Sequence, residues 1–317
     1  MKLIIQIPCF NEEQNLPITL RELPRKLKGI DKIEWLVIND GSTDKTAEVA
    51  KDNGVDHILN FSHNKGLAKA FMGGLIESLK LGADIIVNLD ADNQYCAEDI
   101  PLLIEPILKG EAEIVIGERP ISQTVHFPKT KIILQKIGSS VVRLLSNTRV
   151  PDAPSGFRAI SRDAAFQINV FNDYTYTLEM IIEAGQKGIP IKSVPIRTNK
   201  PLRESRLITS VTKYIGYSTL TIIRTFITYK PLRFFFIIGS IFLTSGIFVG
   251  IRWLLLFFGG PQASSIPSLI LTAILLILGF ILIIFGLIAD LMTVNRKLLE
   301  EIQVKLRKNE LEKSGST

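Results

Sequence analysis

Cysteine and histidine are scarce in this 317-residue sequence, which has two cysteines and three histidines. Cys9 and Cys96 are too few to build a disulfide framework. His57 begins a predicted strand, whereas His63 and His126 lie in predicted loops without ligand-spaced partners. The sequence therefore excludes a disulfide-rich fold and contains no zinc-binding pattern.

Glycine-rich phosphate-binding motifs are also missing. No Gly-x-x-x-x-Gly-Lys-Ser/Thr and no Gly-x-Gly-x-x-Gly segment occurs, so a phosphate group has to be bound by a metal ion or by basic side chains. The net charge of +6 suits nucleic acid, but no recognition-helix pattern or aromatic-basic repeat accompanies it. We therefore expect no nucleic-acid partner.

Charged residues are missing from two long segments near the carboxyl end. Residues 234–251 are uncharged and continue, after Arg252, with six more apolar residues, and residues 266–289 form a second uncharged run. Each run reaches the ~20 residues that cross a ~30 Å hydrocarbon core. The mean hydropathy of +0.26 is high for an α/β domain alone. We expect a two-helix transmembrane hairpin over residues 232–291, not two buried helices of a soluble core.

Lysine and arginine flank these runs on one side only. Lys230 and Arg233 precede the first run, residues 296–308 contain five basic residues, and the connector at residues 259–267 is uncharged. By the positive-inside rule, both termini and the domain before the hairpin face the cytoplasm. Residues 1–5 are too short an apolar run for a signal peptide. We expect a cytoplasmic (inner) membrane protein with a basic tail over residues 292–317.

Residues 206–229 combine basic and apolar side chains with the period of a helix. At 100° per residue, Arg206, Lys213 and Arg224 fall within about 20° of one another, and the apolar residues fall on the opposite face. We expect interfacial amphipathic helices over residues 203–231. Their basic face is either an anchor for anionic headgroups or a docking site for a lipid phosphate.

Short apolar runs alternate with helix-like segments before residue 203. Strands are predicted at residues 3–7, 35–38, 57–61 and 113–116 and in the run from Ile85, and helices near residues 12–27, 43–53, 66–82 and 97–109. This alternation predicts a mostly parallel sheet with helices on both faces. We expect an α/β domain over residues 1–202.

Two aspartates, Asp90 and Asp92, end the predicted strand from Ile85. Side chains at i and i+2 of an extended segment point the same way, so both carboxylates can bind one hard cation and, through it, a diphosphate. A calcium loop needs Gly and Glu where the sequence has Tyr95 and Pro101. A nucleophilic aspartate is disfavoured because Gln94 stands where Thr or Val is usual.

Polar clusters follow three predicted strands, at residues 8–12, 39–44 and 90–92. Because parallel strands end at one edge of a sheet, the clusters are expected to meet where ligands bind. In the second cluster, we assign helix capping to Ser42 or Thr43 and ligand binding to Asp40. Together the clusters predict a nucleotide-sugar site.

Six segments occur in a characteristic order. They are Pro-Cys-Phe-Asn-Glu-Glu at 8–13, Asn-Asp-Gly-Ser-Thr-Asp at 39–44, Asn-Lys-Gly-Leu-Ala-Lys-Ala at 64–70, Asp-Ala-Asp-Asn-Gln at 90–94, Gly-Glu-Arg at 117–119 and Asp-Ala-Pro-Ser-Gly-Phe-Arg at 152–158. In combination they resemble family-2 glycosyltransferases. More narrowly, the chain resembles polyprenyl-phosphate glycosyltransferases: dolichyl-phosphate mannose synthases and the bacterial bactoprenol glucosyltransferases with a two-span tail. The resemblance covers residues 1 to about 295 and implies a Rossmann-like GT-A fold.

The resemblance also implies roles for particular residues. Ala68 departs from the glycine that is frequent in such enzymes, next to Lys69. Mg²⁺ or Mn²⁺ is assigned to Asp90, Asp92 and Gln94. The nucleotide sugar is assigned to six residues at the predicted strand ends and on the helix that follows: Pro8, Phe10, Glu12, Asp40, Lys69 and Asp90.

The acceptor implied by the resemblance is a lipid monophosphate, whose anionic oxygen needs little or no proton removal. Catalysis then depends on the metal, which stabilises the leaving diphosphate, and on arginines that hold two anions together. We place Arg119 and Arg158 at the catalytic centre with Asp152, which is either a base or the partner that orients an arginine. The lipid phosphate is assigned to four basic residues: Arg149, Arg206, Lys213 and Arg224.

The predicted function is transfer of one sugar to polyprenyl (undecaprenyl) phosphate with inversion at the anomeric carbon. The favoured sugar is glucose, from UDP-glucose. Processive synthases of the wider family carry Gln-x-x-Arg-Trp, which is missing here. Two alternatives stay open: another donor, namely GDP-mannose, UDP-N-acetylglucosamine or an aminoarabinose donor, or a non-catalytic membrane-anchored module that binds nucleotide sugar. Glu179, on a helix predicted over residues 175–187, either faces the sugar or is exposed. The small-xxx-small spacing of Gly246 and Gly250 indicates close helix packing or a homo-oligomer.

Overall fold

The computed structural model describes residues 1–120, 142–143, 146, 148, 150–170, 176–199, 223–224, 226–258 and 266–314. The chain divides into two compact units. One unit comprises Met1–Thr219 with Gln303–Thr317, and the other comprises Leu220–Ile302.

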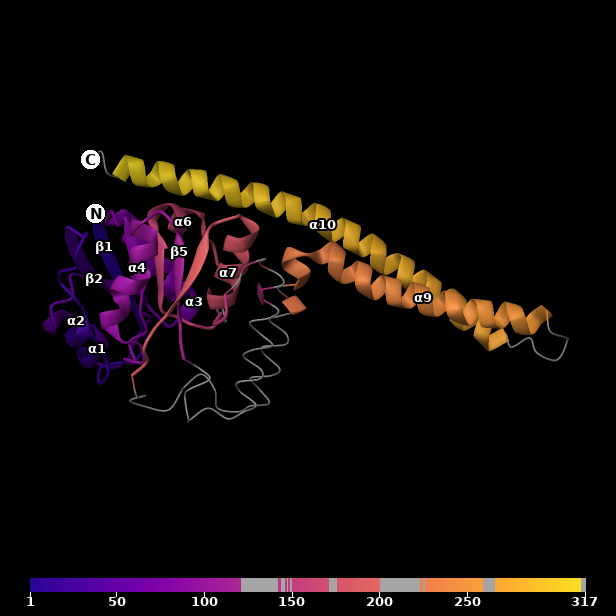
Figure 1. Cartoon of the computed structure of the whole chain (residues 1–317), viewed down its shortest axis with the longest axis horizontal. Coiled ribbons are helices and arrows are strands. Elements are labelled where there is room, and N and C mark those ends of the chain that lie inside the picture. The colour runs from indigo at the N-terminus through magenta and orange to yellow at the C-terminus, as the bar shows by residue number, and fades with distance from the viewer. Residues whose placement is uncertain are drawn as a thin grey trace. The chain divides into compact units, whose positions relative to one another are not determined.

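Seven strands of the described part of the first unit form one sheet in the order β3-β2-β1-β4-β6-β5-β7 (Figure 1). They are β1 (Lys2–Cys9), β2 (Lys32–Asn39), β3 (His57–Asn60), β4 (Ile85–Asn88), β5 (Ile114–Glu118), β6 (Arg158–Ser161) and β7 (Ile191–Pro195). β6 runs antiparallel to β4 and β5, and the other pairs are parallel. The mostly parallel sheet is confirmed, although β6 and β7 were not predicted from the sequence.

The direction of β6 decides which loops meet. β1, β2 and β4 are neighbours and end at the same edge of the sheet, as do β5 and β7. Because β6 is antiparallel, residues 152–157, which precede it, lie at that same edge. Residues 152–157 thereby lie beside the polar clusters that were predicted at this edge, although they do not follow a parallel strand.

Helices cover both faces of the sheet (Figure 1). α3 packs on β1 and β2, while α4 packs on β5, β6 and β7. Ser161 caps α6, since its side chain accepts a hydrogen bond from the Ala164 amide. The helices are α1 (Leu16–Glu22), α2 (Thr46–Asp52), α3 (Leu67–Lys80), α4 (Ile100–Leu108) after the 3₁₀ turn η1 (Ala97–Asp99), α6 (Arg162–Gln167) and α7 (Tyr176–Gln186).

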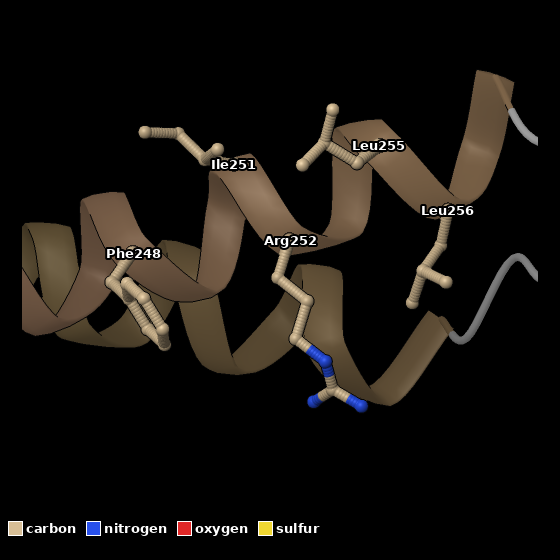
Figure 2. A pocket seen from close by; sticks show the side chains of 5 residues that line it. All are labelled: Phe248, Ile251, Arg252, Leu255 and Leu256. Atoms are coloured by element: carbon tan, nitrogen blue, oxygen red, sulfur yellow. The ribbon is translucent and has the colours of Figure 1, made fainter.

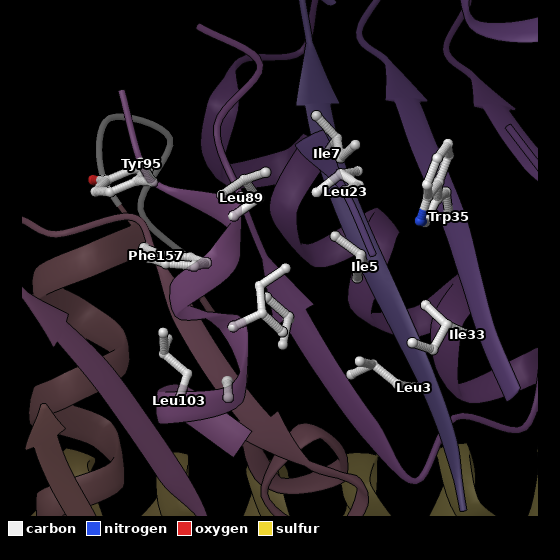
Figure 3. Packing of buried hydrophobic residues seen from close by; sticks show 14 of the residues in the cluster. Leu3, Ile5, Ile7, Leu23, Ile33, Trp35, Leu89, Tyr95, Leu103 and Phe157 are labelled. Carbon is white, nitrogen blue, oxygen red and sulfur yellow. The ribbon is translucent and has the colours of Figure 1, made fainter. Parts of the chain in front are cut away.

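The core lies on both sides of the central strands, which explains their nearly unbroken apolar sequence. On one side, Leu3, Ile5 and Ile7 of β1 are fully buried and belong to the cluster drawn in Figure 3. Trp35 of β2 and Leu103 of α4 belong to the same cluster. This packing makes the sheet a rigid support for the loops at its edge.

One ion cluster lies at the other end of β1 and β2. Glu34 is 5% exposed, and its carboxylate oxygens lie 2.7 Å from Lys2 Nζ, 2.6 Å from Lys32 Nζ and 2.9 Å from His57 Nε2. Burial by itself raises the pKa of Glu34, but hydrogen bonds from Lys2, Lys32 and His57 outweigh it and lower the pKa to about 2. The cluster therefore stabilises the folded domain only while Glu34 is ionised.

The second unit contains α9 (Pro231–Phe258) and most of α10 (Ile266–Ser314), and both helices are long and apolar enough to span a membrane. Small residues lie where the two helices touch. A Cβ added at Gly239 would lie 2.9 Å from the Gly279 carbonyl oxygen, and one at Gly246 would lie 3.1 Å from Leu275 Cβ. The glycine spacing of α9 thus serves helix packing within the chain.

Two further expectations concern this region. α10 is one continuous helix, so the predicted basic tail is helical as far as Ser314. The predicted amphipathic helices lie largely outside the described residues. A cavity of about 330 Å³ on α9 is lined by Phe248, Ile251, Leu255, Leu256 and Arg252 (Figure 2). Four of these five side chains are apolar, which does not suit a nucleotide sugar.

Candidate active site

The candidate site lies at the edge of the sheet where β1, β2, β4 and β5 end and β6 begins. Cys9 pairs with Asn39 at the ends of β1 and β2, and Gln6 pairs with Asn88 at the end of β4. The polar clusters that follow these strands are therefore neighbours. The convergence predicted from the sequence is confirmed.

Asp40 is 3% exposed and holds the turn that precedes α3. Its Oδ1 accepts a hydrogen bond from the Lys65 amide at 2.7 Å, and its Oδ2 accepts one from the Gly66 amide at 2.9 Å. Gly41 next to it has φ +66°, and a Cβ there would lie 2.3 Å from the His63 carbonyl carbon. Only glycine fits this close approach, which ties the loop after β2 to residues 63–66.

The helix cap after β2 differs from the prediction. α2 begins at Thr46 with Lys45 as its N-cap and without a side-chain hydrogen bond at the cap, so neither Ser42 nor Thr43 caps it; the Thr46 amide donates to Asp44 Oδ1 at 3.0 Å. The two hydroxyl residues lie too far before the first helical turn. Ser42 Oγ instead accepts a hydrogen bond from the Asn11 amide at 3.0 Å. This contact joins the loops that follow β1 and β2.

The remaining donor-site predictions lie around these loops. Pro8 is buried in β1, and Phe10, which is 40% exposed, presents an aromatic ring to solvent. Glu12 is 7% exposed and accepts a hydrogen bond from Asn15 Nδ2 at 2.8 Å. Lys69 is exposed in the first turn of α3. An exposed ring beside polar groups is suited to stack on a nucleobase.

Asp90 and Asp92 follow β4 and interact electrostatically. Burial of its carboxyl group, together with the charge of Asp92, raises the pKa of Asp90, against the influence of Arg119 and Arg158. A Cβ added at Gly156 would lie 2.6 Å from Asp90 Oδ2, so only glycine allows the loop before β6 to approach this closely. The Gln94 amide donates to Asp92 Oδ1 at 3.1 Å.

These residues fit a divalent cation that is shared with a ligand. No three His, Cys, Asp or Glu side chains of the described residues gather in a metal-binding group. Mg²⁺ sites that also bind phosphates need only one or two carboxylates from the protein, because phosphate oxygens and water complete the shell. Asp90 and Asp92 are neighbouring carboxylates, and the charge of Asp92 disfavours the ionised form of Asp90, which matches this requirement.

Arg119, which follows β5, forms a two-point ion pair with Asp152. Nε of Arg119 donates to Asp152 Oδ2 at 2.7 Å and Nη2 donates to Oδ1 at 2.9 Å. Burial by itself lowers the pKa of Arg119, but Tyr95 and Asp152 outweigh it and raise the pKa. Asp152 is 1% exposed, and the Arg119 side chain is 21% exposed. This geometry supports an Asp152 that orients an arginine over one that acts as a base.

The structure corrects the role expected of Arg158. Its side chain is fully buried and donates to the carbonyl oxygens of Ser155 at 2.8 Å, Ala153 at 2.8 Å and Thr177 at 2.9 Å. Arg158 begins β6, and its guanidinium is enclosed by the main chain of the preceding loop and of α7. It therefore shapes residues 152–158 and does not bind two anionic reactants directly.

The other sequence predictions have separate outcomes. Arg149, Arg206 and Lys213 lie outside the described residues, and Arg224 is described and exposed. Glu179 is 8% exposed on α7, so it is not an exposed helix glutamate. The predicted helix over residues 175–187 is confirmed as α7.

A buried polar network beneath the site was missed. Asn88 is fully buried and donates to the Gly156 carbonyl at 2.9 Å and to Tyr176 Oη at 3.0 Å, while it accepts from Gln6 Nε2 at 2.9 Å. The main-chain amide of Gly156 in turn donates to Tyr95 Oη at 2.9 Å. The peptide groups around Gly156 are thus fixed from two directions. Asn88, a polar residue at the end of the apolar run of β4, was the one sequence feature that indicated this network.

Comparison with known proteins decides the family. Residues 4–168, more than half of the chain, match glycosyl transferase family 2. The chain belongs to this family. The resemblance found in the sequence is thereby confirmed.

Two named relatives align with this chain over most of their length. The undecaprenyl-phosphate mannosyltransferase of Micrococcus luteus is 28% identical over 218 residues, which are 65% of this chain and 88% of the relative. The UDP-N-acetylglucosamine–dolichyl-phosphate N-acetylglucosaminyltransferase of Methanococcus voltae is 31% identical over 218 residues, which are 61% of this chain and 83% of the relative.

A solved structure shares the fold. Glucosyl-3-phosphoglycerate synthase from Mycobacterium tuberculosis, in complex with Mn²⁺, UDP-glucose and phosphoglyceric acid, superposes with a TM-score of 0.57 and 18% identity. The match covers 72% of this chain and 79% of that chain. The expected GT-A fold, followed by two long apolar helices, is confirmed.

Proposed function

We propose that this family-2 glycosyltransferase moves one sugar from a nucleotide diphosphate sugar to a polyprenyl phosphate, with a divalent cation and with inversion at the anomeric carbon. The observation that carries the proposal is the meeting, at one sheet edge, of the Asp90–Asp92 pair with Arg119, which Asp152 orients. Carboxylates for a metal and a fixed guanidinium are the groups that a leaving diphosphate requires.

The acceptor is proposed from two independent supports. The relatives named above act, by their names, on undecaprenyl phosphate and dolichyl phosphate. α9 and α10 are long and apolar enough to hold the enzyme in the bilayer in which such an acceptor resides. A soluble acceptor would not require them.

In the proposed reaction, a phosphate oxygen of the acceptor attacks the anomeric carbon. A bond forms between that oxygen and the carbon, the bond from the carbon to the donor diphosphate breaks, and its electron pair departs with the nucleotide diphosphate. Asp90 and Asp92, with Gln94 beside them, would hold a divalent cation, which would supply positive charge to the leaving diphosphate. Arg119 binds phosphate oxygens in the orientation that Asp152 imposes.

The donor is proposed as a nucleotide-activated hexose or N-acetylhexosamine. The resemblance found in the sequence favours UDP-glucose, whereas the relatives reported above are named for mannose and N-acetylglucosamine. We propose that Phe10 stacks on the nucleobase and that Asp40, Glu12 and Lys69 line the donor site. The distribution of lysine and arginine supports a cytoplasmic catalytic unit, where nucleotide sugars are available.

The test is transfer of radiolabelled sugar into polyprenyl phosphate by the purified full chain. EDTA is expected to abolish transfer, and Mn²⁺ or Mg²⁺ is expected to restore it. Asp92→Asn is expected to lose most activity, because a hard dication needs anionic oxygen ligands. Asp52→Asn is the matched control, since Asp52 is exposed at the end of α2. A non-catalytic binding module would retain donor binding and show no transfer in any of these arms.

A further inference from the structure

The segment that follows β7 pairs with the loop that follows the two aspartates. Thr198 forms an antiparallel β-bridge with Tyr95, and the main-chain amide of Asn199 donates to the main-chain carbonyl of Gln94 at 2.9 Å. Residues 196–199 come about a hundred positions later in the sequence than this loop. The sheet order places β7 at the edge beside β5, and the chain then crosses to residues 93–95.

The Asn199 side chain adds to this pairing. Its Nδ2 donates to the Asn93 carbonyl at 3.1 Å and lies 3.4 Å from both the Tyr95 carbonyl oxygen and Glu22 Oε2. Asn93 has φ 55°, in the left-handed region, and its own side chain donates to Glu22 Oε1 at 3.1 Å. A turn of this kind persists when its surroundings hold it.

Residues 196–197 are fixed to the rest of the unit. Ile196 is 5% exposed, and its amide donates to the Glu118 carbonyl at 3.0 Å. The Arg197 amide and Nε donate to the carboxylate of Asp99 at 2.6 and 2.9 Å, and Asp99 is 2% exposed. The segment is therefore a firm support for the loop.

The supported loop leads directly to both aspartates. Gln94 is the residue whose main-chain carbonyl accepts from Asn199. Its main-chain amide donates to Asp92 Oδ1 at 3.1 Å. Tyr95 Oη accepts from the Gly156 amide at 2.9 Å, and Gly156 lies against Asp90. Hydrogen bonds thus link Asn199 to Gln94, which binds Asp92, and to Tyr95, which binds the Gly156 amide next to Asp90.

We propose that Asn199 is a positioning residue that sets the geometry of the metal and diphosphate site by holding residues 93–95. The inference rests on the proposed function and deepens it. Asn199 acts through the main chain of the loop and does not touch the reacting atoms. Its loss is expected to weaken cation binding more than it weakens the fold.

The experiment measures Mn²⁺ affinity of the purified full chain by electron paramagnetic resonance, with saturating UDP and, in parallel, with GDP. Asn199→Ala is expected to weaken Mn²⁺ binding by about 3- to 10-fold, the range that the loss of one hydrogen bond produces. Asn199→Asp keeps the size of the side chain but places a carboxylate oxygen, which accepts hydrogen bonds, against two carbonyl oxygens and Glu22. It is therefore expected to weaken Mn²⁺ binding at least as much as Asn199→Ala. A space-filling role would survive in Asn199→Asp.

Asn53→Ala is the control, because it also removes an amide side chain that donates to a backbone carbonyl, that of Val49 at 2.8 Å. It is expected to leave the Mn²⁺ affinity unchanged. Asn199→Ser, which keeps one donor, replaces Asn199→Ala in the series if that variant does not fold. Unchanged Mn²⁺ affinity in folded Asn199 variants of a chain that transfers sugar overturns this inference alone. A wild-type chain that transfers no sugar overturns the proposed function.

Discussion

Gly156→Ala tests the geometry of the site most sharply, because a single methyl group is added against Asp90. The new Cβ would lie 2.6 Å from Asp90 Oδ2, whereas ordinary contacts begin at 3.4 Å. Either the carboxylate or the loop has to move by about 0.8 Å, the difference between these two distances. Gly156 does not have a positive φ, so alanine is compatible with its backbone and the effect comes from this contact.

A displacement of about 1 Å in a reacting group costs up to roughly 10²-fold in rate. Overpacking costs about 1–3 kcal/mol of stability, which corresponds to roughly 2–4 °C of melting temperature per kcal/mol in a domain of this size. We therefore expect Gly156→Ala to lower kcat about 10- to 100-fold and to remain folded. Initial rates of sugar transfer and melting followed by intrinsic fluorescence measure the two effects separately.

Gly73→Ala is the matched control. A Cβ added at Gly73, on α3, would lie 2.8 Å from the ring of Phe61, which is a partly exposed side chain, and would not meet Asp90. This variant is expected to keep kcat. Wild-type kcat in Gly156→Ala would refute the reasoning, because Asp90 would then tolerate a shift that the mechanism forbids.

Three more predictions follow from other parts of the chain. Asp152→Asn is expected to lower kcat about 10²-fold, because the asparagine cannot accept both guanidinium hydrogen bonds of Arg119. Initial rates at saturating donor and acceptor measure the loss, and an unchanged kcat would contradict the orienting role. The folded pKa of Glu34, about 2, lies below its ordinary value of 4.5, so its stabilisation is complete above pH 4.5 and is lost as the pH falls toward 2. Glu34→Gln is thus expected to lower the stability at pH 7 by about 2 kcal/mol, measured as a fall in melting temperature, and to have little effect near pH 2, with the fluorescence of neighbouring Trp35 as the readout. After replacement of Cys9 and Cys96, a cysteine at Ser264 is expected to react with an impermeant thiol reagent outside intact cells and one at Ser314 is not; labelling at Ser314 alone inverts the proposed topology.

The sequence predicted the features that local pattern determines. Alternating apolar runs and helix-like segments located the first five strands and four helices, and the uncharged runs located both candidate membrane helices. The strand ends then placed Asp40, Asp90 and Asp92 at one edge of the sheet. Each of these predictions depends on residues within a few positions of one another.

The rest depends on tertiary contacts. β6 has only four residues and begins with an arginine, so no period identifies it as a strand. Arg119 and Arg158 look alike in sequence, but Arg119 is paired at the site and Arg158 is enclosed by carbonyl groups. Asn199 holds a loop more than a hundred positions earlier, a contact that spacing does not reveal.

Identification of the lipid product by mass spectrometry tests the central claim most directly. The purified full chain is incubated with Mn²⁺, a short-chain polyprenyl phosphate and, separately, UDP-glucose, GDP-mannose or UDP-N-acetylglucosamine. The account predicts that one donor adds the mass of a single sugar residue to the polyprenyl phosphate, and that Asp92→Asn and EDTA each prevent it. No glycosylated lipid with any donor, or the same product from Asp92→Asn in a chelated buffer, would contradict the account.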